Sequence, residues 1–280
     1  MKVVVGVDGS KYGRWAVEWA ARLPFAERPK IAAVHVVDLN ALRAPLSMVQ
    51  PILVAHTQVL AKEVKKLHAR SKAIKRETAG LLQKLKLQGR VVIERGPVTP
   101  SLLKHCSKNT MLIIGHRGLD AVDRFMLGSV SSQVVTHAQC PILVVKEPAR
   151  AVRRIVLATD GSAESEKAER FLIEELNADS STVEVIVVHA LPFLHYPEWK
   201  GAAAALVRTR ADQLAKKGFR VIEATRIGRP ADEIMRTATK HKANLIVAGA
   251  KGVGAIAGIL LGSVSRKLVQ RSACSVLLVR

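Results

Sequence analysis

Short apolar runs alternate with amphipathic stretches along the whole chain. In the first half, strands are predicted at residues 2–7, 31–37, 91–95, 111–115 and 141–145, and helices at 11–22, about 47–87, 99–108 and 129–138. In the second half, strands are predicted at 154–159, 183–189, 220–225, 244–249 and 275–279, and helices at 163–176, 198–217, 231–241 and 264–272. Since continuous apolar runs suit strands that are buried on both faces, this alternation predicts parallel α/β sheets with right-handed crossovers.

The second half of the chain repeats the first. The segment Val3-Val-Val-Gly-Val-Asp-Gly-Ser10 aligns with Ile155-Val-Leu-Ala-Thr-Asp-Gly-Ser162. A polar stretch that contains proline, Lys-Glu-Pro-Ala-Arg at 146–150, separates the two copies. We therefore expect two tandem α/β domains, over residues 1–147 and 152–280.

A glycine pattern near the end of each copy carries the strongest indication of function. The spacing G-x2-G-x9-G-S occurs at Gly115, Gly118, Gly128 and Ser129, and again at Gly249, Gly252, Gly262 and Ser263. Glycine lets a ligand approach the backbone, and a Gly-Ser pair that opens a helix offers N–H groups and the positive end of the helix dipole to a phosphate. A tight turn and a plain N-cap are the structural alternatives. The identical spacing favours a duplicated nucleotide-binding module.

Charged residues lie beside these glycines. Asp8 and Asp160 end the first strand of each copy, at the edge where parallel sheets collect ligands. We interpret each carboxylate as a contact to a ribose or an adenine edge, and an N-cap or turn role is the alternative. The glycine loops also contain three basic residues, Arg117, Arg124 and Lys251. They could neutralise phosphate charge, and ordinary exposed cations of a strongly basic protein are the alternative.

No pattern in the sequence assigns a catalytic residue or a metal ligand. The chain lacks the GxxxxGK(S/T) motif of P-loop proteins, and it has no Ser/His/Asp set and no paired carboxylates near the glycine loops. Hydrolysis would therefore be slow, because no general base is evident, and Mg²⁺ would arrive with a nucleotide. His35 and His189 lie in apolar strands, where we expect hydrogen-bonded core histidines.

The composition indicates a cellular compartment and a class of binding partner. Three cysteines without metal or disulfide spacing favour a reducing cytoplasm, and no apolar run reaches the about 18 residues that a membrane span needs. The net charge of +21 favours anionic partners. An alternative function is nucleic-acid binding by the basic helix around residues 60–86, although an aromatic content of only 4% argues against base stacking. The simpler interpretation of that helix is a solvated basic face over an apolar seam.

Taken together, these motifs resemble the ATP-binding branch of the universal stress protein family. The likeness rests on the Val-x-x-Asp-Gly-Ser start, the strand with His-Val and the pattern G-x2-G-x9-G-(S/T), and it covers nearly the whole chain as two tandem domains. It implies two doubly wound domains of the adenine nucleotide alpha hydrolase-like type. Each would be a five-stranded parallel sheet of order 3-2-1-4-5, flanked by helices. The implied function is a cytoplasmic stress-response sensor or regulator that binds ATP, with at most slow hydrolysis.

The resemblance also implies a site in each domain. In the first, Asp8 and Val36 would border the adenosine, and the ribose and phosphates would be held by Gly115, Gly118, Gly128, Ser129 and Val130. In the second, the matching residues are Asp160, Ala190, Gly249, Gly252, Gly262, Ser263 and Val264. Family members pair through their final strands, which implies pairing of residues 142–145 with 276–279 inside one chain and permits a homodimer.

Two departures from the family pattern distinguish the two sites. The usual serine after Asp-Gly-Ser is Gly13 in the first copy, whereas Ser165 retains it in the second. The loop at 253–261 has lost the charge that the loop at 119–127 carries. We therefore expect the second site to bind more weakly, or to bind a less charged ligand.

Overall fold

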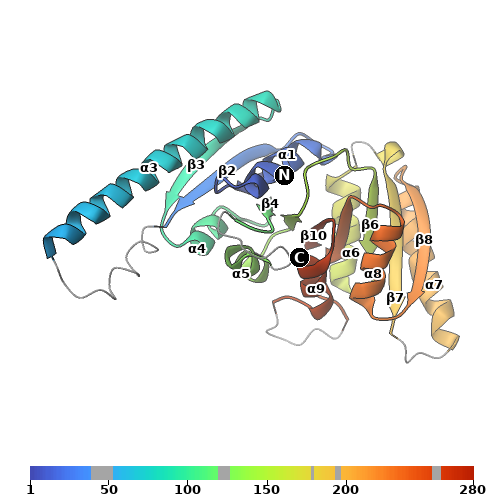
Figure 1. Cartoon of the computed structure of the whole chain (residues 1–280). Coiled ribbons are helices and arrows are strands. Elements are labelled where there is room, and N and C mark those ends of the chain that lie inside the picture. Colours follow the sequence, from blue (N-terminus) through green and yellow to red (C-terminus); the bar gives the residue numbers. More distant parts are fainter. Residues whose placement is uncertain (39–52, 119–126, 178–179, 193–196, 254–259) are drawn as a thin grey trace.

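The computed structural model describes residues 1–38, 53–118, 127–177, 180–192, 197–253 and 260–280. The first half contains β1 (Lys2–Gly6), α1 (Lys11–Arg22), β2 (Lys30–Val37), α3 (Leu53–Lys84), β3 (Gly89–Arg95), α4 (Val98–Leu103), β4 (Thr110–Gly115), α5 (Ser129–His137) and β5 (Ile142–Val145). The second half contains β6 (Arg154–Ala158), α6 (Ala163–Glu175), a 3₁₀ turn (Ser180–Thr182), β7 (Glu184–Leu191), α7 (Pro197–Ala215), β8 (Arg220–Ile227), α8 (Pro230–Lys240), β9 (Leu245–Gly249), α9 (Ser263–Arg271) and β10 (Ser275–Val279). These elements are labelled in Figure 1.

All these strands belong to one continuous sheet, in the order β3-β2-β1-β4-β5-β10-β9-β6-β7-β8. Within each half the pairing is parallel and the order is 3-2-1-4-5, which confirms the predicted α/β fold. The halves meet where β5 pairs antiparallel with β10, with Leu143 opposite Leu277. The final strands of the two copies thus join the two five-stranded units edge to edge.

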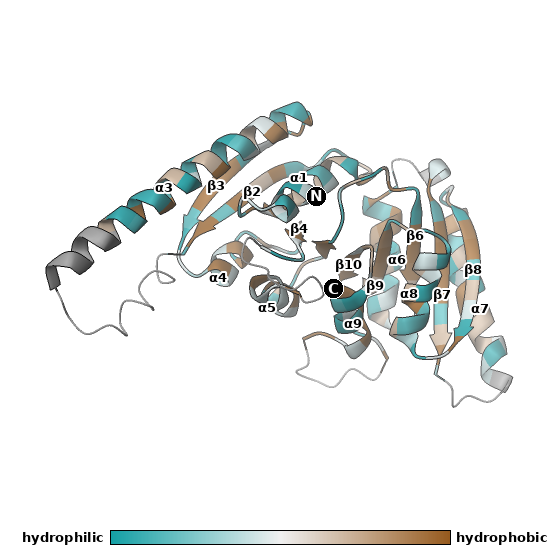
Figure 2. Cartoon of the chain, viewed as in Figure 1, coloured by the Kyte–Doolittle hydropathy of each residue, from teal (hydrophilic) through white to brown (hydrophobic). Residues whose placement is uncertain are grey.

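Helices cover both faces of this sheet. Because successive side chains of a strand point to opposite faces, Val3 and Val5 of β1 pack with α1 and α3, whereas Val4 packs with α4 and α5. In the second half, α6 and α7 lie on the first of these faces and α8 and α9 on the other. Figure 2 shows the resulting apolar strands between helices with polar outer faces.

Two predicted helices differ from the structure in length. The helix predicted over 99–108 ends at Leu103, because the N–H groups of His105 and Cys106 bond to carbonyls only three residues back. The chain then turns directly into β4. The start predicted near residue 47 lies outside the described residues, and α3 is described from Leu53 onward. Figure 1 shows α3 projecting with its first turns beyond the sheet. Among the described helices, none is long and apolar enough to cross a membrane.

Candidate functional site

A pocket of about 350 Å³ lies at the carboxyl ends of β1 and β4. At this point the strand order reverses direction, which is where open parallel sheets bind ligands. The pocket brings together every residue predicted for the first site: Asp8, Val36, Gly115, Arg117, Gly118, Gly128, Ser129 and Val130. Arg124 lies outside the described residues.

The pocket has an apolar wall and a polar end. The wall is formed by side chains of β2, β4 and α4, namely Val34, Val36, Val98, Leu102 and Ile114. At the polar end, Gly128 is the N-cap of α5, so no N-cap side chain occupies the first amides of the helix. The first amides of a helix have no intrahelical acceptor, so the start of α5 offers N–H donors to the pocket. Such a pocket suits a ligand with a flat apolar part and an anionic part.

A buried serine fixes the start of α5 against β4. The Ser131 hydroxyl donates to the carbonyl oxygen of Gly115 at 2.8 Å, and the Gly128 N–H donates to the carbonyl oxygen of His116 at 2.9 Å. The second copy repeats both contacts: Ser265 donates to Gly249 at 2.8 Å and the Gly262 N–H donates to Ala250 at 2.9 Å. Sequence reasoning missed these serines, although the repeated Gly-Ser-Val-Ser at 128–131 and 262–265 was a visible signal.

The glycines around Asp8 make room for its carboxylate. A Cβ at Gly118 would lie 2.8 Å from Asp8 Oδ2, and a Cβ at Gly13 would lie 2.9 Å from Asp8 Oδ1. Asp8 Oδ1 also accepts the Ser10 N–H at 2.9 Å, which orients the side chain at the pocket wall. The replacement of the family's serine by Gly13 thus leaves space beside this carboxylate.

The positive charge at the pocket comes from Arg117 rather than from its neighbour His116. Arg117 is buried and lines the pocket. Burial, aided by the nearby charges of Arg117 and Lys146, lowers the pKa of His116 to about 4. His116 is therefore neutral at pH 7, and its Nδ1 lies 3.3 Å from the carbonyl oxygen of Val145 as a donor.

In the second copy, the carboxylate of Asp160 is held by several hydrogen bonds. Asp160 Oδ2 accepts the Val253 N–H at 2.9 Å, and Oδ1 accepts the Ser162 N–H at 3.0 Å. Burial disfavours the ionised form of Asp160, but the hydrogen bonds from Ser162 and Val253 outweigh it and lower its pKa. The other predicted residues of this copy occupy matching places: Ala190 in β7, Gly249 at the end of β9, Lys251 and Gly252 in the next loop, and Gly262, Ser263 and Val264 at the start of α9.

The two strand histidines are hydrogen-bonded, as predicted, and His189 is half-buried. His35 is buried with Nδ1 3.0 Å from the carbonyl oxygen of Val7, and His189 Nδ1 lies 2.7 Å from that of Thr159. Each imidazole thus ties the second strand of its copy to the end of the first. Among the described residues, no group of three or more His, Cys, Asp or Glu side chains is arranged to hold a metal ion.

Comparisons with known proteins place these features in a family. The model of the universal stress protein family matches residues 1–146 and 151–280. A universal stress protein of Mycobacterium tuberculosis strain H37Rv is 29% identical over 307 aligned residues, which cover 99% of this chain and 94% of that protein. One from Mycolicibacterium smegmatis is 28% identical over 294 residues, covering 99% and 96%.

Solved structures show the same fold. The crystal structure of a universal stress protein from Archaeoglobus fulgidus has a TM-score of 0.73 at 18% identity, and the match covers 100% of this chain and 98% of that one. A putative universal stress protein from Pseudomonas aeruginosa has a TM-score of 0.63 at 15% identity, covering 99% and 92%.

Proposed function

The chain belongs to the universal stress protein family in its tandem form, and from this premise we propose that it binds ATP in the pocket at the ends of β1 and β4. The observation that carries the proposal is the convergence of all the predicted first-site residues on this one pocket. Its volume of about 350 Å³ falls within the about 300 to 1,000 Å³ that is usual for small-molecule sites. In the cell, the protein would act as a cytoplasmic stress-response sensor or regulator.

The lining residues suit the parts of the nucleotide. The apolar wall, with Val36 and Leu102, fits the adenine, and the Asp8 carboxylate can accept hydrogen bonds from ribose hydroxyls. The amides at the start of α5 and the Arg117 guanidinium fit the phosphates, because both present N–H donors and positive charge. Binding, rather than turnover, is the activity that this set of residues supports.

Hydrolysis would be slow at most. Among the described residues that line the pocket, Asp8 is the only carboxylate, and its Oδ1 accepts the Ser10 N–H. We therefore assign it to binding rather than to proton abstraction from water. Mg²⁺ would enter with the phosphates, its usual partners in nucleotide sites.

Isothermal titration calorimetry with ATP tests the proposal. Gly128→Val is the informative variant, because a Cβ there would meet Arg117 Cα at an ordinary 3.4 Å while the side chain blocks the path to the α5 amides. We expect it to weaken the tightest ATP site by at least about tenfold without unfolding the protein.

Gly262→Val is the matched control, since a Cβ there also meets its nearest atoms at 3.4 Å but lies in the second copy. It should leave the tightest site unchanged. Absence of binding at millimolar ATP, or equal affinity in the wild type and Gly128→Val, would refute the proposal.

A further inference from the structure

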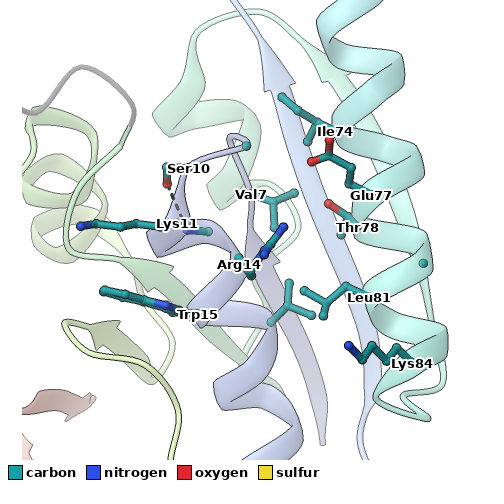
Figure 3. A pocket seen from close by; sticks show the side chains of 14 residues that line it. Val7, Ser10, Lys11, Arg14, Trp15, Ile74, Glu77, Thr78, Leu81 and Lys84 are labelled. Atoms are coloured by element: carbon teal, nitrogen blue, oxygen red, sulfur yellow. Dashed lines mark hydrogen bonds between the residues drawn. The ribbon is translucent and has the colours of Figure 1, made fainter.

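A second cavity, of about 590 Å³, lies between α1 and α3 on the opposite side of the loop that carries Asp8. Figure 3 shows Arg14 of α1 and Ile74 and Leu81 of α3 in the space between the two helices. We call it the α1–α3 groove; it is lined by Val7, Gly9, Ser10, Lys11, Gly13, Arg14, Trp15, Val17, Ile74, Glu77, Thr78, Gly80, Leu81 and Lys84. We propose that it binds an amphipathic anion, a medium-chain aliphatic carboxylate. This inference does not rest on the proposed ATP site.

The floor of the α1–α3 groove is aliphatic. Val7 directly follows β1, Val17 lies in α1, and Ile74 and Leu81 lie in α3. Ile74 and Lys84 are ten residues apart on α3, so the groove runs along about 15 Å of the helix. A long, narrow apolar floor of this kind suits an extended alkyl chain better than a compact ring system.

The rim of the groove is positively charged. Arg14 on α1 and Lys84 on α3 line the groove with a single carboxylate, that of Glu77, whereas Lys11 Nζ lies over the ring of Trp15, 5.5 Å from its centroid. In Figure 3, Arg14 points between the two helices and Lys84 points from α3 toward α1. None of the ion pairs between described residues involves Arg14 or Lys84. A ligand carboxylate would accept charge-assisted hydrogen bonds from Arg14 and Lys84.

In the second copy, the space that corresponds to the α1–α3 groove is closed. Leu206 of α7 lies 3.5 Å from a Cβ placed on Gly161, just as Ile74 of α3 lies 2.9 Å from one placed on Gly9. These contacts align α7 with α3 and place Arg210 at the position of Thr78. The comparison is therefore between equivalent positions of one duplicated fold.

At those positions the two copies differ in charge. Arg210 pairs with Glu166 at 2.6 Å and with Glu169 at 3.1 Å, so its guanidinium spans the space between α6 and α7. The first copy has Arg14 in place of Glu166 and Val17 in place of Glu169. The side chain that bridges the helices has thus been lost, the floor is more apolar, and a cation without an acidic partner remains at the rim. These differences leave an open space beside a cation, and an anionic ligand would supply the negative charge that the glutamates provide in the second copy.

Gly80 offers a variant that adds a large side chain at the open edge of the groove without disturbing the fold. It lies on α3 between Glu77 and Lys84, it lines the groove, and a Cβ there would have no atom within 4 Å. Gly80→Leu therefore projects into open space, and leucine is a better helix former than glycine. Gly201→Leu is the matched control, because Gly201 lies in α7 and a Cβ there likewise meets nothing within 4 Å.

The test is calorimetric titration of the full chain with decanoate, decanol and decylammonium, each below its micellar concentration. We expect decanoate to bind at least about tenfold more tightly than the other two. Gly80→Leu should abolish decanoate binding, while Gly201→Leu should leave it unchanged. The double variant Arg14→Gln/Lys84→Gln should lose the preference for decanoate over decanol.

Three results would overturn the proposal: no decanoate binding by the wild type at low millimolar concentration, equal binding by wild type and Gly80→Leu, or equal affinity for the three probes. Gly128→Val separates this proposal from that of the ATP site. It should retain decanoate binding whether or not it affects binding of ATP, because Gly128 does not line the groove.

Discussion

At the scale of single residues, different physical constraints explain why the repeated positions are occupied by glycine. A Cβ at Gly115 would lie 2.5 Å from Tyr12 Cβ, and one at Gly249 would lie 2.7 Å from the carbonyl carbon of Glu164. These two glycines let the first turn of α1 or α6 pack against the end of the adjacent strand. At Gly128, by contrast, the protein itself leaves room for a side chain. The space there is what a ligand would use.

Gly115→Ala should therefore lower the free energy of unfolding by about 1–3 kcal/mol, the usual cost of overpacking. The added methyl group would push against the backbone of α1, which cannot move away without disturbing the core. Urea unfolding followed by circular dichroism measures the effect. Gly128→Ala is the control and should change stability much less. Equal losses in the two variants would show that the close approach of α1 does not explain Gly115.

At the scale of elements, apolar patterning was sufficient to predict the strands. The predicted runs at 111–115 and 275–279 correspond to β4 and β10, because a strand buried on both faces leaves an uninterrupted apolar signal. The end of α4 could not be predicted in this way. Lys104 and His105 are compatible with a helix, but both bond to Glu94 of β3, and the chain turns there.

The candidate site, like the elements, could be predicted only in part from the sequence. Local motifs indicated the glycines and Asp8, which follow strands in sequence. The apolar wall of the pocket could not be found from motifs, because Val34, Val98 and Leu102 come from separate elements that only the folded sheet brings together. For the same reason, the α1–α3 groove could not be inferred from the periodicity of α3 alone.

Ser131 provides a test of how α5 is held. Its buried hydroxyl bonds to the carbonyl oxygen of Gly115, and this contact positions the helix start at the pocket. Ser131→Ala should cost about 1 kcal/mol of stability and should also weaken ATP binding, because the α5 amides lose their fixed position. Ser132→Ala, at the next and exposed position, is the control for urea unfolding and calorimetry. If both variants bind ATP like the wild type, the hydroxyl does not orient the site.

At the scale of the whole molecule, the duplication produces two related but unequal halves. The antiparallel pairing of β5 with β10 joins them into one sheet, and Lys146 Nζ adds a bond of 2.7 Å to the carbonyl oxygen of Ser272 across the junction. On one face the first copy has an open groove where the second has ion pairs of Arg210. At the strand ends, Arg117 in the first copy corresponds to Lys251 in the second. Divergence after duplication has thus altered the sites while the sheet order was kept.

This inequality predicts one tight ATP site per chain. In the second copy, a ribose that bonds to Asp160 Oδ2 must compete with the Val253 N–H, which already donates to that oxygen at 2.9 Å. The corresponding residue of the first copy, Leu119, lies outside the described residues, but the loop at 119–127 contains the charged residues that the loop at 253–261 lacks. Calorimetry should therefore give a stoichiometry near one, with any second site at least about tenfold weaker. Gly128→Val should remove the tight site and leave the weak one, and two equal sites in the wild type would contradict the prediction.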